Sequence, residues 1–139
     1  MDATLAAREA EIVETFEALG DTFARYEYLI ELGRDLPPLP DEFKNDTFRV
    51  RGCQAQVWLV PELRGERLHL RGDSDALITR GLVALLVETL TDLPPAVVAE
   101  AELGFLKDIG LDEHLSATRR NGLAAMVTRL KAYAQTLAG

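Results

Sequence analysis

Cysteine, histidine and long apolar runs are all scarce in this chain of 139 residues. Its single cysteine, Cys53, excludes an internal disulfide, a paired-cysteine redox motif and any metal or cluster site built only from its own cysteines, because each needs at least two thiols. No segment approaches the roughly 20 apolar residues that cross a bilayer. The N-terminus carries acids where a signal peptide carries bases. We therefore expect a cytoplasmic protein with no membrane contact.

Basic residues are also few. Fifteen Lys and Arg against 23 Asp and Glu give a formal net charge of −8, so the general attraction to phosphate that underlies nucleic-acid binding is missing. We expect no nucleic-acid partner. The only net-positive region is 47–80, where six arginines face four acids around Cys53.

The composition, 47% hydrophobic and 27% charged, is typical of one compact domain, and we expect residues 1–139 to form a single domain. Apolar spacing predicts helices in 1–20 and 21–33, with Phe23 on the buried face of the second. The prolines of 36–40 then predict an extended connection.

Between residues 47 and 72, apolar and polar residues alternate with a period of two, which predicts three short antiparallel strands. Asp73 or Ser74 is expected to cap a central, almost wholly apolar helix that runs to Thr91. Further helices are predicted over 94–102, 105–110 and about 116–137. The fold class is therefore α+β, with a small antiparallel three-stranded sheet packed against several helices.

Cys53 is expected on a loop between the first two strands. A buried structural cysteine is the commonest alternative, but the neighbours of Cys53 do not suit a dry core: Arg51, Gly52, Gln54 and Gln56. Charges on Arg49 and Arg51 could favour the thiolate and lower the pKa of Cys53. The residues favour a reactive thiol.

The candidate partners of this thiol are limited. The two histidines, His69 and His114, have no spacing that predicts a catalytic triad, and two histidines with one distant cysteine predict no metal site. Gln54, Gln56 and Trp58 alternate on one side of the second strand and would form a docking patch for a partner if Trp58 is exposed; a core position for Trp58 is the alternative. A cysteine hydrolase and a noncatalytic thiol-containing binding domain both stay open from the residues alone.

Four segments occur in an order that resembles the SufE family, the sulfur-acceptor proteins of the SUF system for iron–sulfur cluster assembly. The resemblance covers about residues 10–137, and its segments are YLIELGRDLPPLP, VRGCQAQVWLV, LHLRGDSDALITRGL and HLSATRRNGLAAM. It implies a SufE/IscU-like fold in which Cys53 matches the persulfide-carrying cysteine. Cys53 would take sulfur from a SufS-type cysteine desulfurase, stimulate that enzyme, and deliver the sulfur to a SufB-containing scaffold.

The resemblance also implies the residues of the site. Asp75 matches an aspartate that restrains the cysteine loop, and Arg119 matches an arginine of the site and of the desulfurase contact. Gly52, Gln54 and His114 match as supporting residues, and the residues expected to contact the partner are Arg51, Gln56, Trp58 and Arg119. No metal or cofactor is implied on this chain, since the pyridoxal phosphate belongs to the desulfurase. The paralogue CsdE carries similar motifs, which leaves a CsdA-type desulfurase open as the partner, together with weak homodimerisation.

Overall fold

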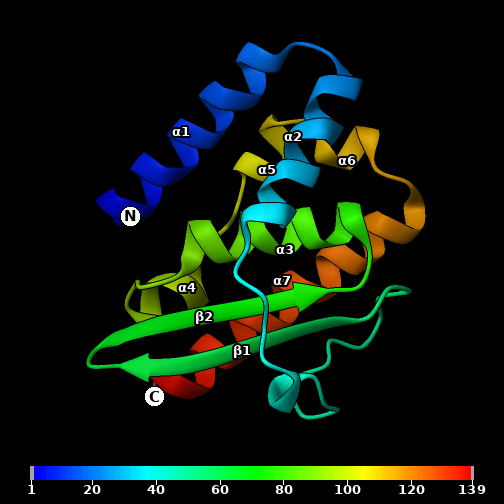
Figure 1. The fold of residues 1–139 in the computed structure, drawn as a ribbon. Helices are drawn as coiled ribbons and strands as arrows, with labels where there is room; N and C mark the ends of the chain where they lie inside the picture. Colours follow the sequence, from blue (N-terminus) through cyan, green and yellow to red (C-terminus); the bar gives the residue numbers. More distant parts are fainter. Residues whose placement is uncertain (1, 139) are drawn as a thin grey trace.

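The computed structural model describes residues 2–138 as helices around a two-stranded antiparallel sheet, shown in Figure 1. The elements in chain order are α1 (Ala3–Leu19), α2 (Thr22–Asp35), a 3-10 turn η1 (Asp41–Phe43), β1 (Val57–Arg64), β2 (Arg67–Ser74), α3 (Leu77–Leu90), α4 (Pro95–Glu100), α5 (Phe105–Asp108), α6 (Leu111–His114) and α7 (Ala117–Ala138). The α+β class is confirmed. Among the described residues, no helix is both long enough and apolar enough to cross a membrane.

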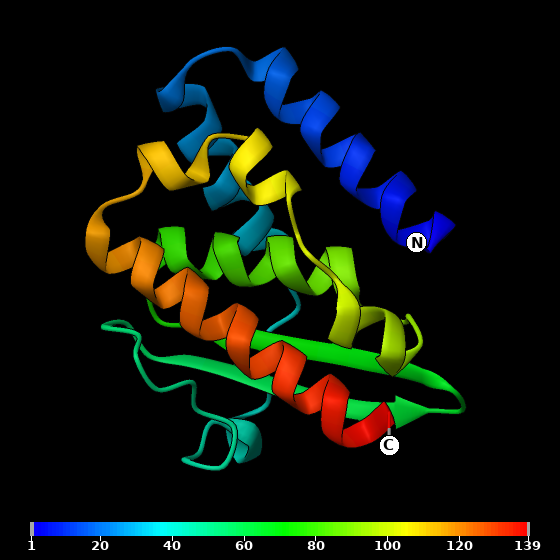
Figure 2. The same ribbon diagram turned by 180° about the vertical axis from the view of Figure 1, so that it is seen from behind.

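Different segments of the chain pack on the two faces of the sheet. α3 and α7 lie on one face, and the connection between α2 and β1 crosses the other, as Figures 1 and 2 show together. Because side chains alternate along a strand, Val57 and Leu59 join the main core with the helices, whereas Trp58 and Val60 join a second cluster with Leu39 of the connection. The sheet therefore separates two apolar clusters.

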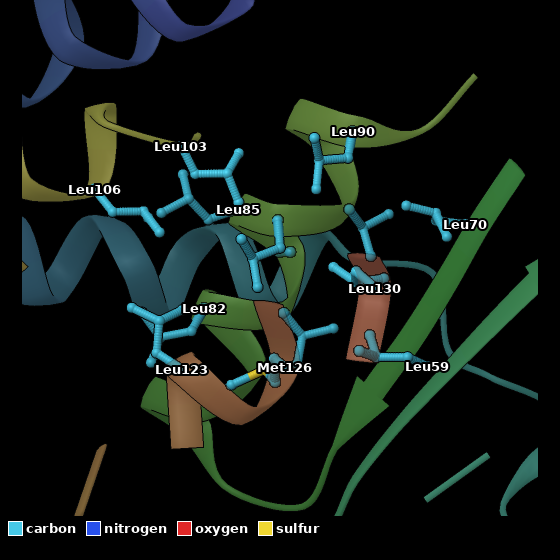
Figure 3. Packing of buried hydrophobic residues seen from close by; sticks show 14 of the residues in the cluster. Leu59, Leu70, Leu82, Leu85, Leu90, Leu103, Leu106, Leu123, Met126 and Leu130 are labelled. Carbon is cyan, nitrogen blue, oxygen red and sulfur yellow. The ribbon is translucent and has the colours of Figure 1, made fainter. Parts of the chain in front are cut away.

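α3 is the central core element, as its sequence predicts. Most of its side chains are buried, and leucines of the sheet, α3 and α7 interdigitate in Figure 3. α2 packs tightly on α3 because Gly81 and Gly33 lie at their crossing. A Cβ on Gly81 would overlap the Leu29 carbonyl oxygen, and a Cβ on Gly33 would lie 2.9 Å from the Gly81 nitrogen.

The prediction of three strands is wrong, because the first one is reduced to a single bridge. Residues 48–50 pair with β1 only through the bridge between Arg49 and Trp58. The Asn45 carboxamide closes a turn by accepting from Thr47 N at 2.9 Å, and the chain turns again at Gly52, whose φ is +92°. Only a few extended residues fit between these turns, too few for a ladder.

The boundaries of α2 and α3 also differ from the prediction. Phe23, expected in the core, is 73% exposed, because it lies in the first turn of α2, where the Asp21 side chain caps the helix. α2 continues past Gly33 to Asp35. β2 extends to Ser74, so neither of the two expected cap residues is the N-cap of α3, which is Ala76.

Candidate functional site

Cys53 lies between the turn at Gly52 and the start of β1, with its side chain turned inward against α7. Its thiol donates a hydrogen bond to the Gly122 carbonyl oxygen, with Sγ and O 3.4 Å apart. The thiol packs directly against the helix backbone here, since a Cβ on Gly122 would lie in van der Waals contact with Sγ, at 3.5 Å. The half-buried thiol is therefore held against the helix and does not stand at an exposed loop tip.

The thiol opens into a cavity of about 440 Å³. Three parts of the chain line it, namely the cysteine loop, the start of α3 and the first turns of α7. The lining residues are Cys53, Gln54, Ala55, Ala76, Thr79, Ser116, Thr118, Arg119, Gly122 and Met126. The cavity has room for an additional sulfur atom on Cys53.

The local electrostatics differ from the sequence prediction. Burial raises the pKa of the Cys53 thiol above its ordinary value of 9.0, and no described charged group counteracts that effect. Arg51 is exposed, and Arg49 lies at the bridge to Trp58, so the expected lowering of the pKa by these arginines is wrong. The resting thiol is protonated at neutral pH.

Asp75 holds Gln56, the residue just before β1, which forms the base of the cysteine loop. Its carboxylate accepts a hydrogen bond from the Gln56 N–H at 2.9 Å, and its own N–H donates to the Gln56 carbonyl oxygen at 3.3 Å. Arg119 lines the cavity in the first turn of α7, where its N–H donates to Ser116 Oγ at 3.2 Å. Within the described part of the chain, Asp75 and Arg119 form no ion pair. Asp75 therefore acts on the loop through Gln56.

The expected docking patch is only partly present. Gln54 and Gln56 are exposed beside the cavity, but Trp58 is only 9% exposed and packs with Leu39 and Val60. The assignment of Trp58 to partner contact is wrong, because the α2–β1 connection covers the face of the sheet to which its side chain points.

The histidines lie outside the cavity lining. His114 is exposed, its Nδ1 lies 3.3 Å from Thr22 Oγ1, and its carbonyl oxygen accepts from the Tyr26 hydroxyl. His69 Nδ1 lies 2.9 Å from Asp92 Oδ1, on β2. The structure therefore brings no histidine to Cys53. Among the residues described, no group of three or more His, Cys, Asp and Glu could hold a metal ion.

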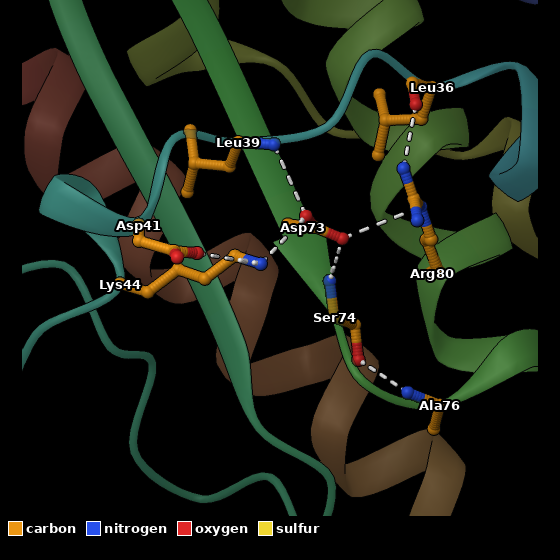
Figure 4. Close-up of polar contacts among 8 residues, drawn as sticks. All are labelled: Leu36, Leu39, Asp41, Lys44, Asp73, Ser74, Ala76 and Arg80. Carbon is orange, nitrogen blue, oxygen red and sulfur yellow. Dashed lines mark hydrogen bonds and ion pairs between the residues drawn. The ribbon is translucent and has the colours of Figure 1, made fainter.

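Two residues near the site were not singled out for it by the sequence reasoning. Gly122 had no assigned role, although a glycine inside a helix costs about 1 kcal/mol and so signals a close approach. Asp73 was read as a helix cap. It is instead a buried carboxylate that joins several segments in Figure 4.

The chain resembles proteins of one family along nearly its whole length. Residues 10–134 match the family model described as "SufE: Fe-S metabolism associated domain". An uncharacterized SufE-like protein of Rhizobium etli is 40% identical over 133 residues, which cover 92% of this chain and 90% of that protein. A second, of Rhizobium meliloti, is 38% identical over 130 residues, covering 90% and 93%. The "Cysteine desulfuration protein SufE" of Plasmodium vivax is 33% identical over 130 residues, covering 90% of this chain and 52% of that protein.

The fold also has a counterpart among solved structures. The solution structure of a hypothetical protein from Thermus thermophilus matches with a TM-score of 0.77 at 26% sequence identity. The match covers 93% of this chain and 94% of that one. The arrangement of helices around the small sheet is therefore shared by a distant sequence.

Proposed function

This chain belongs to the SufE family, and from that premise we propose that Cys53 accepts a sulfur atom from the persulfide of a SufS-type cysteine desulfurase. The observation that carries the proposal is the position of the chain's only thiol. Cys53 faces a cavity of about 440 Å³ on a loop whose base is held by Asp75.

The transfer is a thiol exchange. The Cys53 thiolate attacks the terminal sulfur of the donor's persulfide, a new S–S bond forms on Cys53, and the donor's S–S bond breaks. The donor cysteine leaves as a thiolate and takes up the proton that Cys53 lost, so the exchange requires no external oxidant or reductant. It needs no second cysteine, metal or cofactor on the acceptor, and the pyridoxal phosphate resides on the desulfurase.

The relay requires two positions of the loop, and the structure describes the resting one. In the resting position the thiol is protonated, donates to Gly122 and is a poor nucleophile, which also limits its oxidation. In the active position the loop swings out about its base at Gln56 and carries Cys53 into the donor's site. Gln54, Gln56 and Arg119, all exposed beside the cavity, contact the desulfurase there.

After the exchange, the loop returns the persulfide to the cavity and later presents it to a SufB-containing scaffold for iron–sulfur cluster assembly. By accepting sulfur, the protein stimulates turnover of the desulfurase. We place this relay in the cytoplasm. A CsdA-type desulfurase would use the same thiol by the same exchange.

The test is mass spectrometry of the protein after incubation with a SufS-type desulfurase and free cysteine. We expect a mass gain of one sulfur atom on Cys53 in the wild type, and neither mass gain nor stimulated sulfide release with Cys53→Ser. If Cys53→Ser stimulates the desulfurase as well as the wild type does, the relay is refuted. His69→Ala is the matched control, since His69 lies on β2 outside the cavity lining and should leave sulfur uptake intact.

A further inference from the structure

Asp73 is a buried carboxylate that contacts four residues from three parts of the chain, as Figure 4 shows. One oxygen accepts from the Ser74 N–H at 2.8 Å and faces Arg80 Nε on α3 at 3.4 Å. The other accepts from the Leu39 N–H at 3.2 Å and faces Lys44 Nζ at 3.5 Å. The side chain of Asp73 therefore fastens the end of β2 to α3 and to the α2–β1 connection.

A buried carboxylate contributes little net stability to a fold. A buried charge loses its hydration, and a well-packed apolar residue often stabilises as much or more. Asp73 is only 4% exposed, and its hydrogen bonds and cations recover part of that loss. A buried carboxylate with several directional contacts fixes the relative positions of the segments it joins, which an apolar side chain does less well.

The segment that Asp73 fixes carries parts of the cysteine site. Asp73 and Arg80 bracket residues 74–79, which include Asp75 and two residues of the cavity wall, Ala76 and Thr79. Arg80, at the C-terminal end of this segment, has a second contact, because its Nη2 donates to the Leu36 carbonyl oxygen at 2.7 Å. A shift of this segment would move the carboxylate of Asp75 away from the loop base that it holds.

We propose that Asp73 is a positioning residue for sulfur transfer. Its four contacts, that with Lys44 included, together hold the segment that carries Asp75, and through Asp75 they keep the Cys53 loop closed. Asp73 is not among the residues that line the cavity. The link to sulfur transfer rests on the proposed function of Cys53, whereas the link to loop closure does not.

The test is the rate at which iodoacetamide alkylates Cys53 in the folded protein at neutral pH. Asp73→Asn should raise this rate about tenfold, because it removes the charge from a network of hydrogen bonds. Lys44→Gln removes one partly exposed contact and should raise the rate about twofold. If Asp73→Asn does not fold, the alkylation rate of Lys44→Gln tests the proposal in its place.

Val98→Ala is the matched control, since Val98 is fully buried in α4 and does not line the cavity. It should lower the global stability without raising the alkylation rate. Alkylation can follow either local opening of the loop or global unfolding, and the urea dependence of the rate distinguishes them. A rate set by local opening stays constant at low urea, whereas a rate set by global unfolding rises with urea in proportion to the m-value of unfolding.

The proposal is overturned if neither Asp73→Asn nor Lys44→Gln accelerates alkylation, or if the accelerated rate rises with urea with the slope of global unfolding. The assay contains no desulfurase. Suppose that Asp73→Asn speeds alkylation of Cys53 while the wild type takes up no sulfur from a desulfurase. That result would refute the relay and leave the positioning role of Asp73 intact.

Discussion

Gly122→Ala tests whether the thiol of Cys53 really rests against α7. The three heavy atoms nearest to the new methyl group would all belong to Cys53, with Sγ at 3.5 Å and Cα and Cβ at 3.9 Å, which are ordinary contact distances. Replacing glycine by alanine inside a helix stabilises it by about 1 kcal/mol. The methyl also covers part of the cysteine loop. Burying one methylene contributes roughly 0.8 kcal/mol, so a half-covered methyl stabilises the closed loop by about 0.4 kcal/mol.

We therefore expect Gly122→Ala to raise the free energy of unfolding by about 1 kcal/mol and to slow alkylation of Cys53 about twofold. Urea denaturation gives the first quantity, and the alkylation rate of the folded protein gives the second. The same substitution at Gly81 is the matched control, because its Cβ would overlap the Leu29 carbonyl oxygen and should destabilise the α2–α3 crossing.

A destabilised Gly122→Ala, or one whose Cys53 reacts faster than the wild type, would contradict the reasoning. Either result would mean that a methyl group has no room between the thiol and α7. The resting position of the loop would then differ from the one described.

Three further predictions follow from the same geometry. Asp75→Ala removes the acceptor of the Gln56 N–H and should speed alkylation of Cys53 about fivefold; an unchanged rate would show that Asp75 does not restrain the loop. Trp58→Ala should lower the free energy of unfolding by about 3–5 kcal/mol, whereas urea denaturation would detect almost no loss if Trp58 were an exposed docking residue. Burial raises the pKa of Cys53 in the folded state, so the unfolded chain releases this proton first as the pH rises past 9.0. The stability of the wild type should fall relative to that of Cys53→Ala in that range, and parallel pH profiles of the two proteins would count against a buried thiol.

The sequence was most informative where structure depends on neighbouring residues. The apolar content of α3, the glycines and prolines between elements, and the Asp21 cap predicted most helices, because these signals act over a few residues. The cysteine loop was also found, since Gly52 supplies a positive φ just before Cys53 and the alternating pattern of β1 begins soon after.

Errors arose where a distant segment decides the environment. Trp58 reads equally well as a docking residue until the α2–β1 connection covers its face of the sheet. Phe23 fits the buried stripe of α2, but α6 reaches the first turn of that helix at Thr22 and leaves Phe23 73% exposed. The first of the three predicted strands is wrong for a local reason, because the turns at Asn45 and Gly52 leave too few extended residues between them.

The charge environment of Cys53 shows why proximity in sequence misleads about reactivity. Arg49 and Arg51 closely precede Cys53 in the sequence and predicted a lowered pKa. Because Cys53 turns inward, burial instead raises its pKa. A thiol that is protonated at rest and hydrogen-bonded to Gly122 cannot start an exchange from that position. If the relay operates as proposed, the closed loop suppresses side reactions, and the deprotonation that makes Cys53 a nucleophile occurs after the loop has left its cavity. The residues that set the closed position, Asp75 directly and Asp73 through it, then regulate the transfer without touching the sulfur.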